Sequence, residues 1–100
     1  MVKLMDQLKE CTGFLWDSGN SVKNWHKHDV SQSECEQIFF NRPLILRRDK
    51  KHSEDEARYY TLGQTDAKRL LFTVFTLRNR KIRVISVRDM TSKEECRYIK

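Results

Sequence analysis

Two apolar runs joined by a short basic turn constrain the fold of this chain more than any other feature. Residues 70–77 are apolar on both faces, which is typical of a central strand in a sheet. Residues 78–81 read Arg-Asn-Arg-Lys, and Asn79 tolerates the positive φ that a tight hairpin requires. Residues 82–87 then run back as a second strand. The sequence therefore predicts an antiparallel hairpin at the centre of a sheet.

A turn at Asn79 and Arg80 determines which side chains share a face of this hairpin. Arg83 is expected beside Thr76 on one face. Without a bulge, Arg83 and Arg88 project to opposite faces of the sheet. The face opposite Arg83 is expected to hold four cross-strand pairs: Leu77 with Ile82, Phe75 with Val84, Thr73 with Ser86, and Leu71 with Arg88.

Two capping boxes predict where helices begin. Ser31 and Glu34 form the first, and Pro43 is expected to end the helix that follows. Thr91 and Glu94 form the second, which starts a C-terminal helix that continues to Tyr98. The first helix carries a stripe at i, i+3 and i+4 that is expected to face the core: Cys35, Ile38 and Phe39.

The other elements are shorter or less sharply bounded. Leu4, Leu8 and Cys11 have helical spacing, so the start of the chain is expected to be a short amphipathic helix or a partly ordered extension. The fold class is therefore α+β, with N-terminal helices, a roughly four-stranded antiparallel sheet and a C-terminal helix. The elements expected between the two ends are a brief strand at 14–16, a helix from 17 or 18 to 28, and strands at 44–46 and 58–62. Four aromatic residues are expected in the core: Trp16, Trp25, Phe39 and Phe40.

Charge is distributed unevenly along the chain. Residues 1–46 hold five cations and six anions, whereas residues 47–100 hold fifteen cations and eight anions. Five of the cations, and no acid, lie between Arg78 and Arg88. Guanidinium groups match phosphate oxygens, so this cluster indicates an anionic partner, with nucleic acid as the leading candidate. The alternatives are a surface charge that serves solubility, or a charged strand edge that discourages aggregation.

The three cysteines are odd in number and widely spaced, so no disulfide framework is expected and a reducing cytoplasm fits best. The chain has no signal peptide and no apolar run of 18 residues, so we expect a soluble protein. A zinc site built from Cys11, His26, His28 and Cys35 is conceivable. However, histidines at i and i+2 face different ways on a helix, so no metal is expected. Nucleotide-binding and common hydrolase motifs are missing, and no cofactor is expected.

Residues 24–28 combine two histidines and a lysine. Histidine is the usual general base near neutral pH, and lysine or arginine stabilises charge on a reacting phosphate. RNA supplies its own 2′-hydroxyl nucleophile, so a metal-free ribonuclease needs only a base, an acid and cations. The residues alone thus indicate a basic α+β domain with a phosphate site. A module that binds RNA or a partner without catalysis remains the alternative.

Taken together, the motifs resemble the BrnT family of bacterial toxins from type II toxin–antitoxin systems. The resemblance runs from Phe14 to about Tyr98 and leaves residues 1–13 as an extension beside a single domain at 14–100. Five positions depart from the family pattern: Asn20 stands in place of a lysine, Asp29 in place of a glycine, Gln32 in place of an aromatic residue, and Val87 and Met90 in place of alanines. The matching pieces are, in order, Phe14-Leu15-Trp16-Asp17, Asn24, Lys27-His28, Val30, Glu34, Phe39-Phe40, Pro43, His52-Ser53, Glu56-Ala57-Arg58, Gly63, Arg69-Leu70-Leu71, residues 74–78, residues 82–88, Thr91, Glu94 and Tyr98.

The resemblance implies a RelE-like fold and a metal-independent endoribonuclease that arrests growth. It also implies a cognate antitoxin of the BrnA kind, and a complex that binds promoter DNA through that antitoxin. On this interpretation Arg78 and Arg83 hold the scissile phosphate. Lys27 or His28 takes the proton-transfer or electrostatic role. Arg88 and Tyr98 line the site, and Glu94 is a helix cap.

Overall fold

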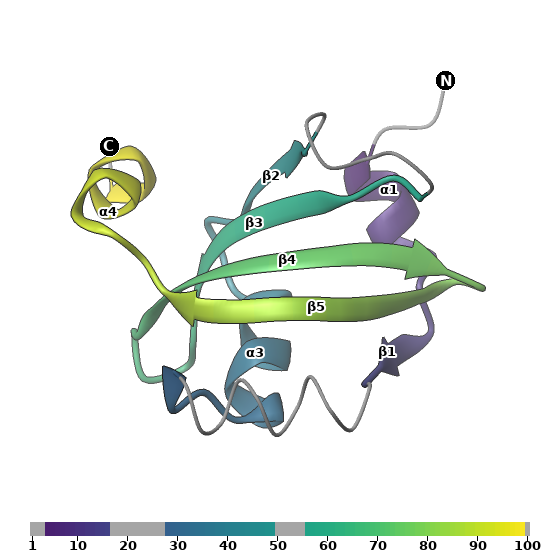
Figure 1. Ribbon diagram of the computed structural model, residues 1–100, viewed down its shortest axis with the longest axis horizontal. Helices are drawn as coiled ribbons and strands as arrows, with labels where there is room; N and C mark the ends of the chain where they lie inside the picture. The colour runs from purple at the N-terminus through teal and green to yellow at the C-terminus, as the bar shows by residue number, and fades with distance from the viewer. Residues whose placement is uncertain (1–3, 17–27, 50–55, 100) are drawn as a thin grey trace.

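The computed structural model describes residues 4–16, 28–49 and 56–99. Within these ranges the chain forms one sheet with short helices at its faces and end (Figure 1). The predicted helix at 17–28 lies outside the described residues apart from its last position. The elements are α1 (Leu4–Lys9), β1 (Gly13–Leu15), α3 (Gln32–Ile38), β2 (Ile45–Arg48), β3 (Tyr59–Gln64), β4 (Leu70–Arg78), β5 (Lys81–Asp89) and α4 (Ser92–Ile99).

The sheet has five strands in the order β1-β5-β4-β3-β2. The four strands β2 to β5 pair antiparallel, and β4 lies at the centre as its apolar sequence predicts. The prediction of a wholly antiparallel sheet was wrong, because β1 pairs parallel with β5 along that strand's outer edge. Three residues are too few for a recognisable period, and the pairing joins segments almost seventy residues apart. The sheet is therefore mixed.

The central hairpin turns at Asn79 and Arg80, which have φ values of 53° and 62°. Two positive φ values at the turn match the right-handed twist of the flanking strands. Next to the turn, the predicted pairs of Leu77 with Ile82, Phe75 with Val84 and Thr76 with Arg83 are confirmed.

A β-bulge then changes the register between Val74 and Phe75. Beyond it Thr73 pairs with Val87 rather than Ser86, and Phe72 rather than Leu71 pairs with Arg88. The bulge gives β5 one extra residue, so its side chains change phase relative to β4. Arg83 and Arg88 consequently project from the same face of the sheet.

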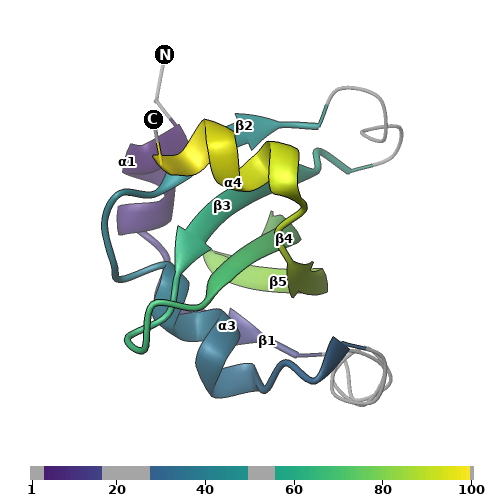
Figure 2. The ribbon, with the colours of Figure 1, turned by 90° about the vertical axis from the view of Figure 1, so that its left-hand side faces the viewer.

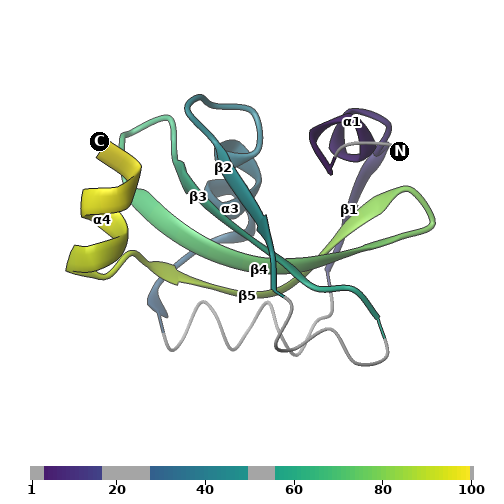
Figure 3. The ribbon, with the colours of Figure 1, turned by 90° about the horizontal axis from the view of Figure 1, so that it is seen from above.

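The main core lies between the sheet and α3, on the side that also carries α1 (Figure 3). The capping box of α3 is confirmed, with Ser31 Oγ accepting from the Glu34 N–H and Glu34 Oε1 accepting from the Ser31 N–H. The predicted stripe is buried, but the helix ends at Ile38 rather than Pro43. Phe40 lies in the turn beyond that end and is 75% exposed, so its assignment to the core was wrong. The buried residues of this core are Val30, Cys35, Ile38, Phe39, Leu71, Phe75, Ile82, Val84 and Val87.

A smaller core lies on the other face of the sheet, under α4 at one end (Figure 2). Leu62, Met90 and Tyr98 are buried there, with Phe72 packed against them. The capping box of α4 is also confirmed, since the Thr91 N–H donates to Glu94 at 2.8 Å. None of the helices in the described ranges is long and apolar enough to cross a membrane.

Candidate functional site

The face of the sheet on which α4 packs carries arginines and aromatic rings, and we call it the basic face. Strand alternation and the observed register define its members, because side chains two residues apart point to the same side of a sheet. Among the described elements, only α4 packs on this side, at one end (Figures 1 and 2). The basic face consists of Arg47, Tyr60, Phe72, Val74, Thr76, Arg78, Arg83, Ser86 and Arg88.

Arg83 lies beside Thr76 near the hairpin end of the basic face. It makes no hydrogen bond or ion pair with another residue of the described ranges. The Thr76 hydroxyl is buried, and it lies close enough to the Glu56 carboxylate to contribute to the lowering of that carboxyl's pKa. The Arg83 guanidinium, the Thr76 hydroxyl and the Glu56 carboxylate therefore adjoin here.

Arg78 forms a two-pronged pair with Glu56 at the same end of the sheet. Its Nε lies 3.1 Å from Oε2, and its Nη2 lies 2.9 Å from Oε1. The hydrogen bond from Arg78 lowers the pKa of Glu56, and the nearby charge of Arg83 lowers it further. Glu56 is therefore an ionised carboxylate between two arginines at neutral pH.

Glu56 is a site residue that the charge pattern did not single out. Its partner on β4 is 22 residues away, and the loop before Glu56 contains several other acids. The only signal was its place among the pieces of the family resemblance.

Arg88 lies at the opposite end of the basic face and binds α4. It donates to both carboxylate oxygens of Glu94, at 2.8 and 3.0 Å, while its guanidinium lies 4.1 Å from the centre of the Phe72 ring. Tyr60 stacks on the Phe72 ring, and the centres of the two rings lie 5.5 Å apart. Hydrogen bonding to Arg88 lowers the pKa of Glu94. Arg88 thus joins the sheet, α4 and an aromatic pair.

Tyr98 is buried in the core beneath α4. Its hydroxyl donates to the carbonyl oxygen of Pro43, and burial raises its pKa. In the free protein the Tyr98 hydroxyl is therefore committed to a structural hydrogen bond.

His28 lies at the far end of the sheet from Arg83, where Arg69 holds the chain before α3. Arg69 pairs with Asp89 at 2.8 Å and Glu34 at 3.0 Å, and it donates to the carbonyl oxygens of Asp29 and His28. The residues from 83 to 89 span roughly 20 Å of strand. His28 and Arg83 are thus held at opposite ends of β5.

Asp29, beside His28, has a φ of 55°. Glycine adopts this conformation freely, and aspartate tolerates it better than most residues. The position at which the resemblance places a glycine is therefore one that requires left-handed backbone. Lys27 lies outside the described residues.

The structure brings Arg78 and Arg83 together, with Thr76 and Glu56 beside them. Arg88 shares their face but lies about 13 Å from Arg83 along the strands. No three of the His, Cys, Asp and Glu side chains in the described ranges are grouped so as to hold a metal ion. Of the cysteines considered as ligands, Cys35 is buried against the Thr73 hydroxyl, and burial raises its pKa to about 12. Chemically, the Arg83 end of the basic face offers an anion site with an adjacent carboxylate.

Comparison with known proteins identifies the family. The family model described as "Ribonuclease toxin, BrnT, of type II toxin-antitoxin system" matches residues 16–94. Among solved structures, the chain is similar to the crystal structure of the Brucella abortus ribonuclease toxin BrnT, with a TM-score of 0.60 and 16% identity. That similarity covers 81% of this chain and 99% of the other. No curated protein sequence matches. Because the family model covers most of its length, this chain belongs to the BrnT family of ribonuclease toxins of type II toxin–antitoxin systems.

Proposed function

We propose that this protein is a metal-independent endoribonuclease that cuts RNA at the Arg83 end of the basic face and thereby arrests growth. The observation that carries the proposal is the grouping of Arg83, which has no partner in the described ranges, with the Arg78–Glu56 pair. A phosphodiester would find two guanidinium groups and one carboxylate there. These are the groups that phosphate binding and proton removal require.

The reaction we propose uses the 2′-hydroxyl of RNA as the nucleophile. Glu56 accepts its proton while the 2′-oxygen bonds to phosphorus. The bond from phosphorus to the 5′-oxygen breaks, and the leaving oxygen takes a proton from water. The products are a 2′,3′-cyclic phosphate and a 5′-hydroxyl. Arg83 and Arg78 stabilise the charge that develops on the phosphate oxygens.

The Arg78–Glu56 pair gives this site a way to activate its base when substrate binds. A phosphate that takes the Arg78 guanidinium removes the hydrogen bond that lowers the Glu56 pKa. Glu56 then becomes a stronger base at the moment when the 2′-hydroxyl is near. His28 is left out of this assignment because of its distance from Arg83.

The remaining basic face is proposed to hold neighbouring nucleotides. Tyr60, which stacks on Phe72, offers an aromatic ring near Arg88, and base stacking on such a ring contributes about 1–3 kcal/mol per base. The proposal has four further parts: a cytoplasmic location, a relation to the RelE-like fold, a BrnA-like antitoxin, and promoter binding by the complex. The family assignment supports them by implying an antitoxin and an RNA target.

The proposal is tested by incubating the purified protein with a single-stranded RNA in EDTA and analysing the products. We expect cleavage that leaves a 2′,3′-cyclic phosphate, and no cleavage of the same sequence as DNA. Induction of the chain alone in a bacterial host is expected to arrest growth. The alternative function, a basic module that binds without catalysis, predicts salt-sensitive RNA binding with no cleavage at any protein concentration.

A further inference from the structure

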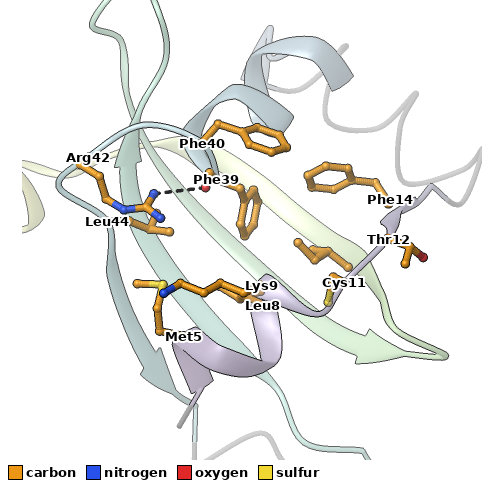
Figure 4. A pocket seen from close by; sticks show the side chains of 12 residues that line it. Met5, Leu8, Lys9, Cys11, Thr12, Phe14, Phe39, Phe40, Arg42 and Leu44 are labelled. Carbon is orange, nitrogen blue, oxygen red and sulfur yellow. Dashed lines mark hydrogen bonds between the residues drawn. The ribbon is translucent and has the colours of Figure 1, made fainter.

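A pocket opens on the side of the sheet opposite the basic face, between α1, β1 and the turn after α3 (Figure 4). Its volume is about 420 Å³. Its walls are mainly apolar, with Leu8 from α1, Phe14 from β1, and Phe39 and Leu44 from either side of the turn. The size and lining are those of a site that takes apolar groups from a ligand or a partner.

Phe40 stands at this pocket with most of its ring in solvent. It is 75% exposed, and its ring centre lies 6.3 Å from that of Phe14 in an edge-to-face arrangement. Aromatic residues that become buried at the centre of a protein interface commonly carry a large share of its binding energy. Phe40 is thus the expected anchor of an interface.

The charges around the pocket indicate the chemistry of the group that it binds. Among the described residues that line it, Lys9 and Arg42 carry charge, and neither forms an ion pair with a carboxylate of the described ranges. The Arg42 guanidinium donates to the carbonyl oxygens of Phe39 and Asn41, at 3.3 and 3.0 Å. An apolar side chain flanked by carboxylates complements this pattern.

We infer that the pocket anchors a short acidic and apolar segment of the antitoxin, an inference that rests on the proposed toxin function. Part of the wall, formed by α1 and the residues up to Phe14, lies before residue 16, where the match to the family model begins. Phe39 and Ile82, which line the pocket, belong to the main core on the side of the sheet opposite the basic face, so substitutions in the pocket are expected to leave the RNA site intact.

The test measures the affinity of the purified chain for the purified product of the adjacent reading frame. The variant Phe40→Ser removes the anchor, and Ile99→Ser is its matched control because Ile99 is 72% exposed on α4. We expect Phe40→Ser to weaken binding at least about tenfold and Ile99→Ser to change it less than about twofold. A double substitution, Lys9→Glu with Arg42→Glu, is expected to weaken binding most at low salt.

Equal affinity of Phe40→Ser and the unsubstituted chain would overturn the inference. A free chain that dimerises, and becomes monomeric as Phe40→Ser, would also overturn it by identifying a second copy as the occupant. RNA cleavage without the adjacent product is measured in parallel for both proteins and is expected to be equal. Failure of the unsubstituted chain to cleave RNA would refute the toxin function. The role of the pocket is tested separately, by comparing the affinities of the unsubstituted chain and Phe40→Ser for the adjacent product.

Discussion

Removal of the Arg88 guanidinium is predicted to loosen α4 from the sheet. Arg88→Ala deletes a two-pronged pair with Glu94 and a contact with the Phe72 ring. The pair contributes about 1–1.5 kcal/mol, a value reduced for solvent screening because the Arg88 side chain is 34% exposed. The ring contact adds about 0.5–1 kcal/mol. The sum of about 2 kcal/mol corresponds to a Tm lower by about 10 °C in a domain of this size.

The pH dependence of this stability has a definite sign. The pKa of Glu94 is lowered in the folded protein, first of all by Arg88. The stabilisation is therefore fully present above the ordinary pKa of a glutamate and is lost as the pH falls through the lowered value. The difference in stability between the unsubstituted chain and Arg88→Ala should shrink below about pH 4.

Urea unfolding of four proteins measures the pair itself: the unsubstituted chain, Arg88→Ala, Glu94→Ala and the double variant. The coupling free energy is predicted to be about 1 kcal/mol at pH 7. A Tm for Arg88→Ala that equals that of the unsubstituted chain would refute the structural role. RNA cleavage by Arg88→Ala, measured well below its Tm, should fall less than in variants of the Arg83 end.

Two other substitutions test the packing and the proposed base. Gly63→Ala places a Cβ in a buried strand, 3.0 Å from the Ile38 Cβ and 3.1 Å from the Leu44 Cδ1. The free energy of unfolding should therefore fall by about 1–3 kcal/mol. An unchanged urea midpoint would contradict this packing. Glu56→Gln keeps the size of the side chain but cannot accept the proton, so the rate of cleavage should fall by about 10²–10⁴-fold. The Tm should change little, because the pair with Arg78 is half-exposed. Cleavage at the unsubstituted rate would exclude Glu56 as the base.

Local chemistry made much of the fold predictable. The turn at Asn79 and the two capping boxes depend on residues within four positions of each other, and all three are confirmed. The bulge was not predicted, because it depends on which side chains of β5 are buried in the core. Val84 and Val87 are both buried, and two residues between inward-facing side chains, instead of the usual one, require one extra residue in β5.

Only the positive charge of the candidate site was predictable from the sequence. The cation cluster indicated Arg78 and Arg83, which the structure brings to one end of the basic face. Glu56 depends on a contact across 22 residues, which no local pattern contains. Phe40 was placed in the core because it follows a helical stripe, but α3 ends two residues earlier and leaves its ring in solvent.

Substitution of Arg83 tests the central claim most directly, because this residue is proposed to bind the reacting phosphate. The measurement is the rate of RNA cleavage by Arg83→Ala, with Arg80→Asn as the control. Arg80→Asn removes the same charge from the hairpin turn, where asparagine tolerates the φ of 62°. We predict that Arg83→Ala keeps its fold, as measured by circular dichroism and Tm, and loses at least about 10²-fold in rate. Arg80→Asn should cleave within a few-fold of the unsubstituted chain. Undiminished cleavage by a folded Arg83→Ala protein would contradict the account.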